Sequence, residues 1–230
     1  MLEFDGIHVT RGSFTLSADL TVPKGARVAV IGPSGSGKST LLSLVGGFLA
    51  PDRGRIRLGG QDITALPPGQ RPVSMLFQDQ NLFPHLTVAQ NVGLGLRPDL
   101  RLSDPQRARV TQVLAEVGLD GMETRRPANL SGGQQSRVAL ARVLLRARPV
   151  LLLDEPFAAL GPALKGDMLA LLARIAEQTD ATVLMVTHDP DDARSFAPRT
   201  ILVDGGVAHP PVPTGPLLDN PPPGLRAYLG

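Results

Sequence analysis

The chain has 230 residues, of which 42% are hydrophobic and 19% are charged, and these values predict one globular domain with its own core. The absence of cysteine excludes a disulfide framework and a cysteine-ligated metal site. A formal net charge of +2 and an aromatic content of 3% argue against a nucleic-acid-binding protein. No apolar run approaches the roughly 18 to 20 residues that span a bilayer, so we expect a cytosolic or peripheral protein.

The segment GPSGSGKST at residues 32–40 fits the pattern G-x-x-x-x-G-K-[ST]. It follows the apolar run RVAVI, a predicted strand, and precedes the helix-like LLSLVGGFL. Such a loop turns backbone N–H groups towards phosphate oxygens, and the helix N-terminus adds a positive dipole end. Lys38 would contact the β- and γ-phosphates, and the Ser39 hydroxyl is a suitable ligand for Mg²⁺. The predicted phosphate-binding residues are Gly32, Pro33, Ser34, Gly35, Ser36, Gly37, Lys38, Ser39 and Thr40; the alternative is an ordinary glycine-rich turn before a helix.

A second nucleotide motif is VLLLDEP at residues 150–156. Its four apolar residues indicate a strand buried on both faces, as in a parallel sheet, and open α/β sheets bind ligands at the ends of such strands. We predict that Asp154 holds Mg²⁺ through water and that Glu155 is the general base for an attacking water. The alternative is that both carboxylates only begin the next loop.

The segment LSGGQ, followed by QSR, completes a set of motifs that resembles the nucleotide-binding subunit of ABC transporters. The resemblance implies two copies in a head-to-tail dimer, in which Ser131, Gly132, Gly133 and Gln134 of one copy close over the γ-phosphate held by the other. These residues begin a predicted helix that continues through VALARVLLRA, so their N–H groups suit an anion. The alternative is an ordinary loop and helix cap.

The same resemblance assigns roles to single residues. Gln78, after the apolar segment VSMLF, would contact Mg²⁺ and the attacking water, and His188, after TVLMVT, would bind the γ-phosphate. Arg11 and Phe14 are the candidates for stacking on adenine, by a planar guanidinium or a ring. In the family an aspartate helps to hold the next loop against the opposite copy; Gly161 stands in its place, so we expect the subunit alone to dimerise weakly with ATP. Pro162 is expected to start the next helix there.

The order of these motifs predicts an α/β fold of the phosphate-loop NTPase type. We expect a core at about 1–78 and 149–205 with a β-rich N-terminal part, and a helical insertion at about 79–148. Within the insertion, a helix over 103–117 would begin at a capping serine and bury Val110, Val113, Leu114 and Val117. The later part should alternate strand 150–153, helix 162–178, strand 182–187 and helix 190–196. The proline-rich tail at 206–230 predicts an extended surface segment.

The segments SMLFQ, AQNVGLGL and LLLDEPFAALGPAL are similar to ATP-binding subunits of bacterial thiamine importers. The resemblance implies an ATPase that uses ATP and Mg²⁺, on the cytoplasmic face of the inner membrane. Its expected partners are a second copy, an integral membrane permease and, indirectly, a secreted or periplasmic solute-binding protein.

The expected solute is thiamine and its phosphates; an inorganic anion, iron or a polyamine is the alternative for the same type of importer. A soluble ABC ATPase of DNA repair or translation is a further alternative. Such proteins usually have paired cassettes or coiled-coil insertions, whereas this sequence has one cassette and no heptad repeat. The loop LFPHL would present Phe83 and Leu86 to the permease, unless Leu86 and Val88 serve the core.

Overall fold

A computed structural model of the chain describes residues 1–77 and 81–229. Its strands are β1 (Leu2–Arg11), β2 (Phe14–Val22), β3 (Arg27–Ile31), β4 (Arg53–Leu58), β5 (Gln61–Asp62), β6 (Val73–Leu76), β7 (Val150–Asp154), β8 (Thr182–Val186), β9 (Arg199–Asp204), β10 (Val207–Ala208) and β11 (Val212–Pro213). Its α-helices are α1 (Lys38–Gly46), α2 (Val88–Gly93), α3 (Asp104–Glu116), α4 (Gly132–Leu145), α5 (Pro162–Thr179), α6 (Pro190–Phe196), α7 (Thr214–Asp219) and α8 (Pro223–Leu229). Short 3₁₀ turns lie at Pro68–Gln70 and Pro127–Asn129.

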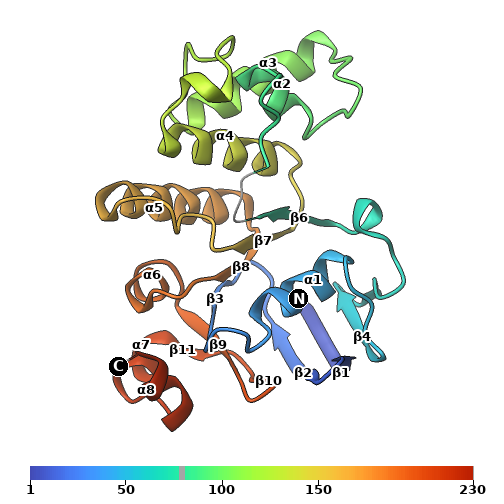
Figure 1. Cartoon of the computed structure of the whole chain (residues 1–230). Helices are drawn as coiled ribbons and strands as arrows, with labels where there is room; N and C mark the ends of the chain where they lie inside the picture. The colour runs from blue at the N-terminus through green and yellow to red at the C-terminus, as the bar shows by residue number, and fades with distance from the viewer. Residues whose placement is uncertain (78–80, 230) are drawn as a thin grey trace.

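The strands pair in the order β5-β4-β1-β2-β10-β9-β3-β8-β7-β6, with β11 beside β9 (Figure 1). The strands β9, β3, β8, β7 and β6 are parallel neighbours. Nearly every residue of β7 and β8 is buried, which explains why their sequences are apolar without alternation. Because these strands are parallel, the loops that follow β3, β7 and β8 start from one edge of the sheet. The predicted α/β class is therefore confirmed, with its nucleotide motifs at adjacent strand ends.

The N-terminal part of the sheet is antiparallel and confirms the predicted β-rich region. The strand β1 lies between β2 and β4, and β5 extends this part beyond β4. Buried and exposed positions largely alternate along β2, as expected where only one face of a sheet is covered. The covered face contributes to an apolar cluster shared with α1.

The helices α2, α3 and α4 form a group at the other side of β6 and β7 from α1 (Figure 1). The predicted helix over 103–117 is confirmed, because Gln106 Oε1 accepts a hydrogen bond from Ser103 N at 2.9 Å and α3 begins at the next residue. The predicted apolar face of this helix is buried. The domain boundaries at residues 78/79 and 148/149 stay predictions.

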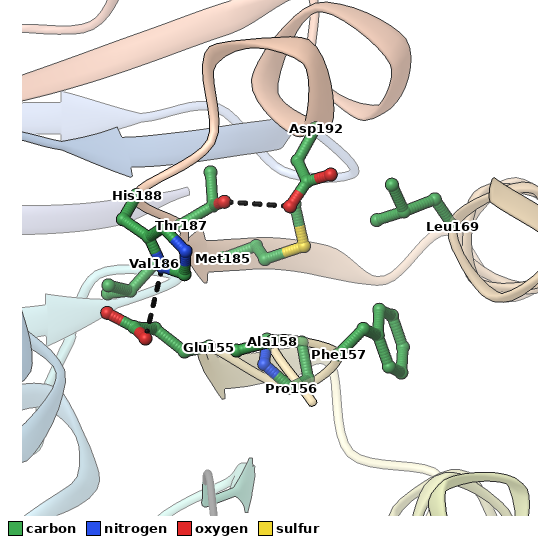
Figure 2. Close-up of a pocket in the computed structure, with 10 residues that line it drawn as sticks. All are labelled: Glu155, Pro156, Phe157, Ala158, Leu169, Met185, Val186, Thr187, His188 and Asp192. Carbon is green, nitrogen blue, oxygen red and sulfur yellow. Dashed lines mark hydrogen bonds and ion pairs between the residues drawn. The ribbon is translucent and has the colours of Figure 1, made fainter. Parts of the chain in front are cut away.

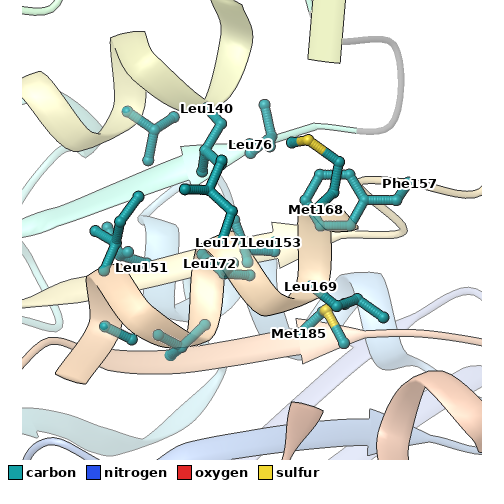
Figure 3. Close-up of a cluster of buried hydrophobic side chains, with 14 of the residues drawn as sticks. Leu76, Leu140, Leu151, Leu153, Phe157, Met168, Leu169, Leu171, Leu172 and Met185 are labelled. Atoms are coloured by element: carbon teal, nitrogen blue, oxygen red, sulfur yellow. The ribbon is translucent and has the colours of Figure 1, made fainter. Parts of the chain in front are cut away.

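A second apolar cluster lies between the parallel strands and the helices on their other face. In Figure 3, Met168 and Leu172 of α5 lie against Leu151 and Leu153 of β7, and Leu140 of α4 approaches from above. The predicted bounds of α5 and α6 agree with the structure to within a residue. Within residues 1–77 and 81–229, no helix has the length and apolarity needed to cross a bilayer.

The prediction of an extended surface segment over 206–230 is wrong. The segment contains the short strands β10 and β11 and the helices α7 and α8, and it buries Leu218 and Leu225 in the second cluster. Its prolines do not prevent these helices, because Pro216 and Pro223 stand in first turns, where a backbone N–H has no partner within the helix. Apolar residues spaced between the prolines therefore fasten the tail to the core.

Candidate nucleotide site

The predicted phosphate-binding loop joins β3 to α1. Gly32 has φ 152°, and a Cβ at this position would lie 2.0 Å from the carbonyl oxygen of Val203. Gly37, with φ 110°, is the N-cap of α1 and brings no side chain to its first turn. The first N–H groups of the helix are thus left without a side-chain cap, which is the arrangement that an anion requires.

The polar side chains of this loop fit a nucleotide phosphate group. The Lys38 ammonium is buried and donates hydrogen bonds to the carbonyl oxygens of Gly32 and Pro33, both at 2.8 Å. Burial lowers the pKa of Lys38, while the charges of Glu155 and Asp154 act in the opposite direction. Among the described residues, Ser36 Oγ is buried without a hydrogen-bond partner. Both groups have hydrogen-bonding capacity that phosphate oxygens can use.

Asp154 lies beside Ser39, as the Mg²⁺ prediction requires. Ser39 Oγ donates a hydrogen bond to Asp154 Oδ1 at 3.1 Å, and burial raises the pKa of Asp154. A hydroxyl and a carboxylate are hard oxygen donors of the kind that Mg²⁺ selects, and Mg²⁺ takes further ligands from phosphates and water. No group of three or more His, Cys, Asp or Glu side chains gathers within the described ranges.

Glu155 and His188 meet at the ends of β7 and β8. His188 Nδ1 and Glu155 Oε2 are 3.2 Å apart, and Figure 2 shows the two side chains pointing towards each other. With an ionised Glu155, this contact requires a proton on Nδ1, which leaves Nε2 free to accept from or donate to a ligand. Glu155 has φ 45°, a left-handed conformation that is strained for a non-glycine residue and often occurs at functional sites.

The structure separates the two candidates for the adenine contact. Phe14 lines an open cleft of about 320 Å³ together with Ser34, Gly35 and Ser36 of the phosphate loop. Arg11 instead donates to Asp52 Oδ1 at 3.0 Å and to the carbonyl oxygen of Ala50 at 3.1 Å. Phe14 is therefore the better placed of the two for stacking on a base that enters this cleft.

The signature residues Ser131 to Gln134 begin α4, away from the phosphate loop. Ser131 Oγ accepts from Gln134 N at 3.3 Å, and Gln134 Oε1 accepts from Ser131 N at 3.0 Å. These two bonds form a capping box. In a single copy, the motif therefore acts as a helix cap, as the alternative predicted. Figure 1 shows α4 and α1 well separated. One copy of the chain therefore does not bring the signature to its own phosphate loop.

Comparison with known proteins identifies the family. A profile of the ABC transporter family matches residues 16–158, which is more than half of the chain. The thiamine import ATP-binding protein ThiQ of Cereibacter sphaeroides is 63% identical over 230 residues and matches over the full length of both chains. The chain belongs to the ABC transporter family. ThiQ of Ruegeria sp. (strain TM1040) is 56% identical to this ABC transporter subunit, again over the full length of both.

Solved structures agree with this assignment. The dimeric, ADP- and Pi-bound state of the ATP-binding cassette MJ0796 has a TM-score of 0.79 at 30% identity, covering 93% of this chain and 99% of that one. A second dimeric structure of the same bacterial ABC transporter cassette gives the same values. The chain is thus an ATP-hydrolysing ABC subunit, whose fold the sequence motifs predicted.

Three further positions concern the ABC site: Gln78, Gly161 and Lys165. Gln78 lies outside the described residues, and its role stays a prediction. Gly161 is the N-cap of α5 without a side-chain hydrogen bond, and Pro162 starts the helix as predicted. Lys165, in the first turn of α5, was not identified from sequence; it contacts the carboxylates that follow His188. A lysine at this point gives no sequence signal, because its partners are more than twenty residues away.

Proposed function

We propose that this ABC subunit binds ATP with Mg²⁺ and uses Glu155 as the general base for ATP hydrolysis. The observation that carries the proposal is the contact between Glu155 and His188, on neighbouring strand ends, beside the loop that holds Lys38 and Ser39. A base and a γ-phosphate ligand at one edge of a parallel sheet are what an in-line attack by water requires.

Each residue of the site has a separate role in ATP hydrolysis. Lys38 exchanges its two loop carbonyls for phosphate oxygens and stabilises the charge of the transferring group. Glu155 accepts a proton from the attacking water. His188 holds this carboxylate through Nδ1–H and, as the imidazolium, donates to the γ-phosphate through Nε2–H. Mg²⁺, held by Ser39 and Asp154 and, as predicted, Gln78, would supply Lewis-acid stabilisation of the phosphate charge. Phe14 would stack on the adenine.

A second copy of the chain supplies the signature. The helices α1 and α4, which begin at the phosphate loop and the signature, lie apart in one copy (Figure 1). A head-to-tail pair in which each signature covers the other copy's phosphate loop satisfies both motifs. The solved structures of the MJ0796 cassette are dimeric, which supports the pairing of two copies. Because both helix ends favour an anion, ATP itself would join the two copies.

Exposed aromatic side chains are the proposed docking surface for the permease. Phe48 and Phe77 make an edge-to-face contact with ring centroids 5.6 Å apart, and both are exposed. Phe83 is 46% exposed, and its loop is fixed by the buried Asn91, whose side chain bonds to the Phe83 N–H and carbonyl. Val88 is fully buried, which agrees with a core role for this part of the segment. A rigid loop with an exposed ring suits an apolar helix of a membrane protein.

The transported solute is proposed to be thiamine, with its phosphates. The support comes from full-length relatives at 63% and 56% identity that are named thiamine import ATP-binding proteins. The permease, a periplasmic or secreted solute-binding protein and a location on the cytoplasmic face of the inner membrane belong to the same proposal. Uptake of an inorganic anion, iron or a polyamine by the assembled system would favour the alternative solutes.

The Glu155→Gln variant tests the catalytic assignment. The amide keeps the shape of the side chain but cannot accept the proton, so we expect hydrolysis to fall at least roughly 100-fold while ATP binding persists. The same variant should accumulate as an ATP-dependent dimer in size-exclusion chromatography. Glu177→Gln, which removes an exposed carboxylate paired with Arg27, is the matched control and should behave as wild type. Hydrolysis within a few-fold of wild type in Glu155→Gln would show that another group is the base.

The docking surface is tested in proteoliposomes that contain the permease. We expect Phe83→Asp to abolish thiamine uptake while the isolated variant retains hydrolysis. Docking would bury the new carboxylate without a partner, whereas position 83 lies outside the nucleotide site. Val212→Asp, at an exposed apolar position of the tail, is the control. Loss of folding in Phe83→Asp alone, measured by thermal unfolding, would instead make Phe83 a core residue.

A further inference from the structure

The Lys165 ammonium lies between two carboxylates next to His188, the proposed ligand of the γ-phosphate. Lys165 Nζ is 2.5 Å from Asp189 Oδ2 and 3.0 Å from Asp192 Oδ1. The side chains of Lys165 and Asp192 are only 17% and 15% exposed, and that of Asp189 is 32% exposed, so the pair with Asp192 is the better shielded from solvent. Ion pairs that are partly shielded are screened less by solvent and salt than exposed pairs.

The two carboxylates hold the chain on both sides of His188. Asp189, the next residue, caps α6 by accepting from Asp191 N at 2.9 Å. Asp192 Oδ2 accepts a hydrogen bond from the hydroxyl of Thr187, the preceding residue, at 2.9 Å (Figure 2). Lys165 is therefore linked to the chain on each side of His188, directly to Asp189 and through Asp192 to Thr187.

Lys165 also belongs to the segment that follows Glu155. It stands in the first turn of α5, and the loop from Glu155 leads directly into this helix. A cavity of about 10 Å³ lies between Glu155, Phe157, Thr187, His188 and Asp192. A backbone hydrogen bond from Glu155 N to the Val186 carbonyl oxygen at 3.1 Å joins the two strand ends, and the Lys165 ion pairs add a side-chain connection between the start of α5 and the residues after His188.

The electrostatics favour a charged triad. Burial opposes the charged form of Lys165, but hydrogen bonds and charge attraction from Asp189 and Asp192 outweigh it and raise the pKa of Lys165. The hydrogen bond from Lys165 is the main cause of the lowered pKa of Asp189. Removal of the ammonium would leave two carboxylates close together, and their repulsion would move the ends of the His188 loop apart.

We propose that Lys165 is a positioning residue, which sets the distance between His188 and Glu155 by tying the start of α5 to Asp189 and Asp192. The inference rests on the proposed roles of Glu155 and His188. It assigns to Lys165 an effect on the rate of hydrolysis rather than on ATP affinity, since none of its partners belongs to the phosphate loop. A displacement of about 1 Å at catalytic groups can lower a rate by roughly 100-fold.

The test compares Lys165→Met, Asp192→Asn and the double variant. We expect each single variant to lower kcat by roughly 10- to 100-fold, with the ATP dissociation constant within about threefold of wild type. The double variant should be no slower than the slower single variant, because both changes remove the same contact. The matched control is Lys24→Met, which breaks an exposed pair with Asp180 at the other end of α5.

Rates are expressed per nucleotide-binding site, titrated with a fluorescent ATP analogue, so that partial unfolding does not count as lost catalysis. Unchanged kcat in Lys165→Met or Asp192→Asn, or multiplied effects in the double variant, would overturn the inference. If Lys165→Met does not fold, Asp192→Asn alone decides, because it keeps the size of the side chain. Parallel assays of His188→Ala and Glu155→Gln test the proposed roles of these two residues separately from the role of Lys165. Full activity in these variants would contradict the proposed function itself.

Discussion

The two helix N-termini that the sequence assigns to ATP differ in their caps. The α1 terminus has Gly37 in a left-handed conformation and no side-chain cap. The α4 terminus has Ser131 and Gln134 in a closed capping box. The first turn of α1 therefore has no side-chain acceptor in a single copy, whereas at α4 the N–H groups of Ser131 and Gln134 are already bonded to side chains.

This difference indicates a sequence of binding events. A terminus without a side-chain cap binds phosphate without displacing a cap, so ATP is expected to bind first at α1. In the capped terminus, the Ser131 oxygen accepts from Gln134 N, but its hydroxyl proton remains available to a phosphate oxygen. The signature can thus join the site of a second copy late, and without losing its cap.

Gly37→Ala should give the largest effect, because it adds a side chain at the N-cap of α1, where phosphate is expected to bind. A Cβ at this position would lie 2.8 Å from Phe14 Cζ, and the left-handed φ costs an L-residue about 1–2 kcal/mol. We expect ATP affinity, measured by calorimetry, to fall by more than about tenfold. Gly35→Ala shares the left-handed conformation but has nothing within 4 Å of its Cβ, and is the control for strain alone. Equal losses in both variants would show that contact with Phe14 is unimportant.

Ser131 variants test whether the capped terminus acts through its cap or its hydroxyl. Ser131→Ala loses the cap and should destabilise the monomer by about 0.5–2 kcal/mol, whereas Ser131→Gly should cost only a few tenths of a kcal/mol, because glycine is itself an acceptable cap. If the hydroxyl binds the partner copy's phosphate, both variants lose ATP-dependent dimerisation in the Glu155→Gln background. Normal dimerisation of Ser131→Gly would instead limit the side chain to capping.

Asp154→Asn tests how much the buried carboxylate beside the phosphate loop lowers the stability of the folded chain. Burial raises the pKa of Asp154, so the folded state disfavours the carboxylate and loses stability as pH rises above the unfolded value of about 4. At pH 7 we expect the variant to have a higher melting temperature than wild type, with Mg²⁺-dependent hydrolysis lost. The difference in melting temperature should disappear below about pH 4, where both states are protonated. A lower melting temperature at pH 7 would mean that the hydrogen bond from Ser39 outweighs burial.

The core could be predicted because its signals are local. The phosphate loop, the apolar strands β7 and β8 and the capped helix α3 each follow from adjacent residues, and the structure places them within a residue or two of the expected bounds. Parallel strands then bring Glu155 and His188 together, which needs only the fold class.

The parts that could not be predicted depend on contacts between distant segments. The tail contains prolines, and only the burial of Leu218 and Leu225 against the core explains its helices. Arg11 and Phe14 have similar stacking chemistry, and only the pairing of Arg11 with Asp52 separates them. The ion pairs of Lys165 join residues on α5 and α6, for which sequence spacing gives no indication.

Gly161→Asp should give the smallest effect on the single copy, and it adds a third helix terminus to the comparison. Gly161 caps α5 with φ −66° and ψ 157°, and a Cβ at this position would meet nothing within 4 Å, so an aspartate fits without strain. An aspartate there should stabilise the monomer by a few tenths of a kcal/mol, or about 0.3–1 kcal/mol if the helix dipole contributes fully. We hypothesise that it also strengthens ATP-dependent dimerisation of Glu155→Gln by about 1–3 kcal/mol per contact, because the family's aspartate holds this loop against the opposite copy. Gly161→Asn caps a helix equally well without the charge, so it separates the two effects. If both variants raise the melting temperature and neither strengthens the dimer, the residue at 161 acts only on its own helix, and the glycine does not weaken the dimer.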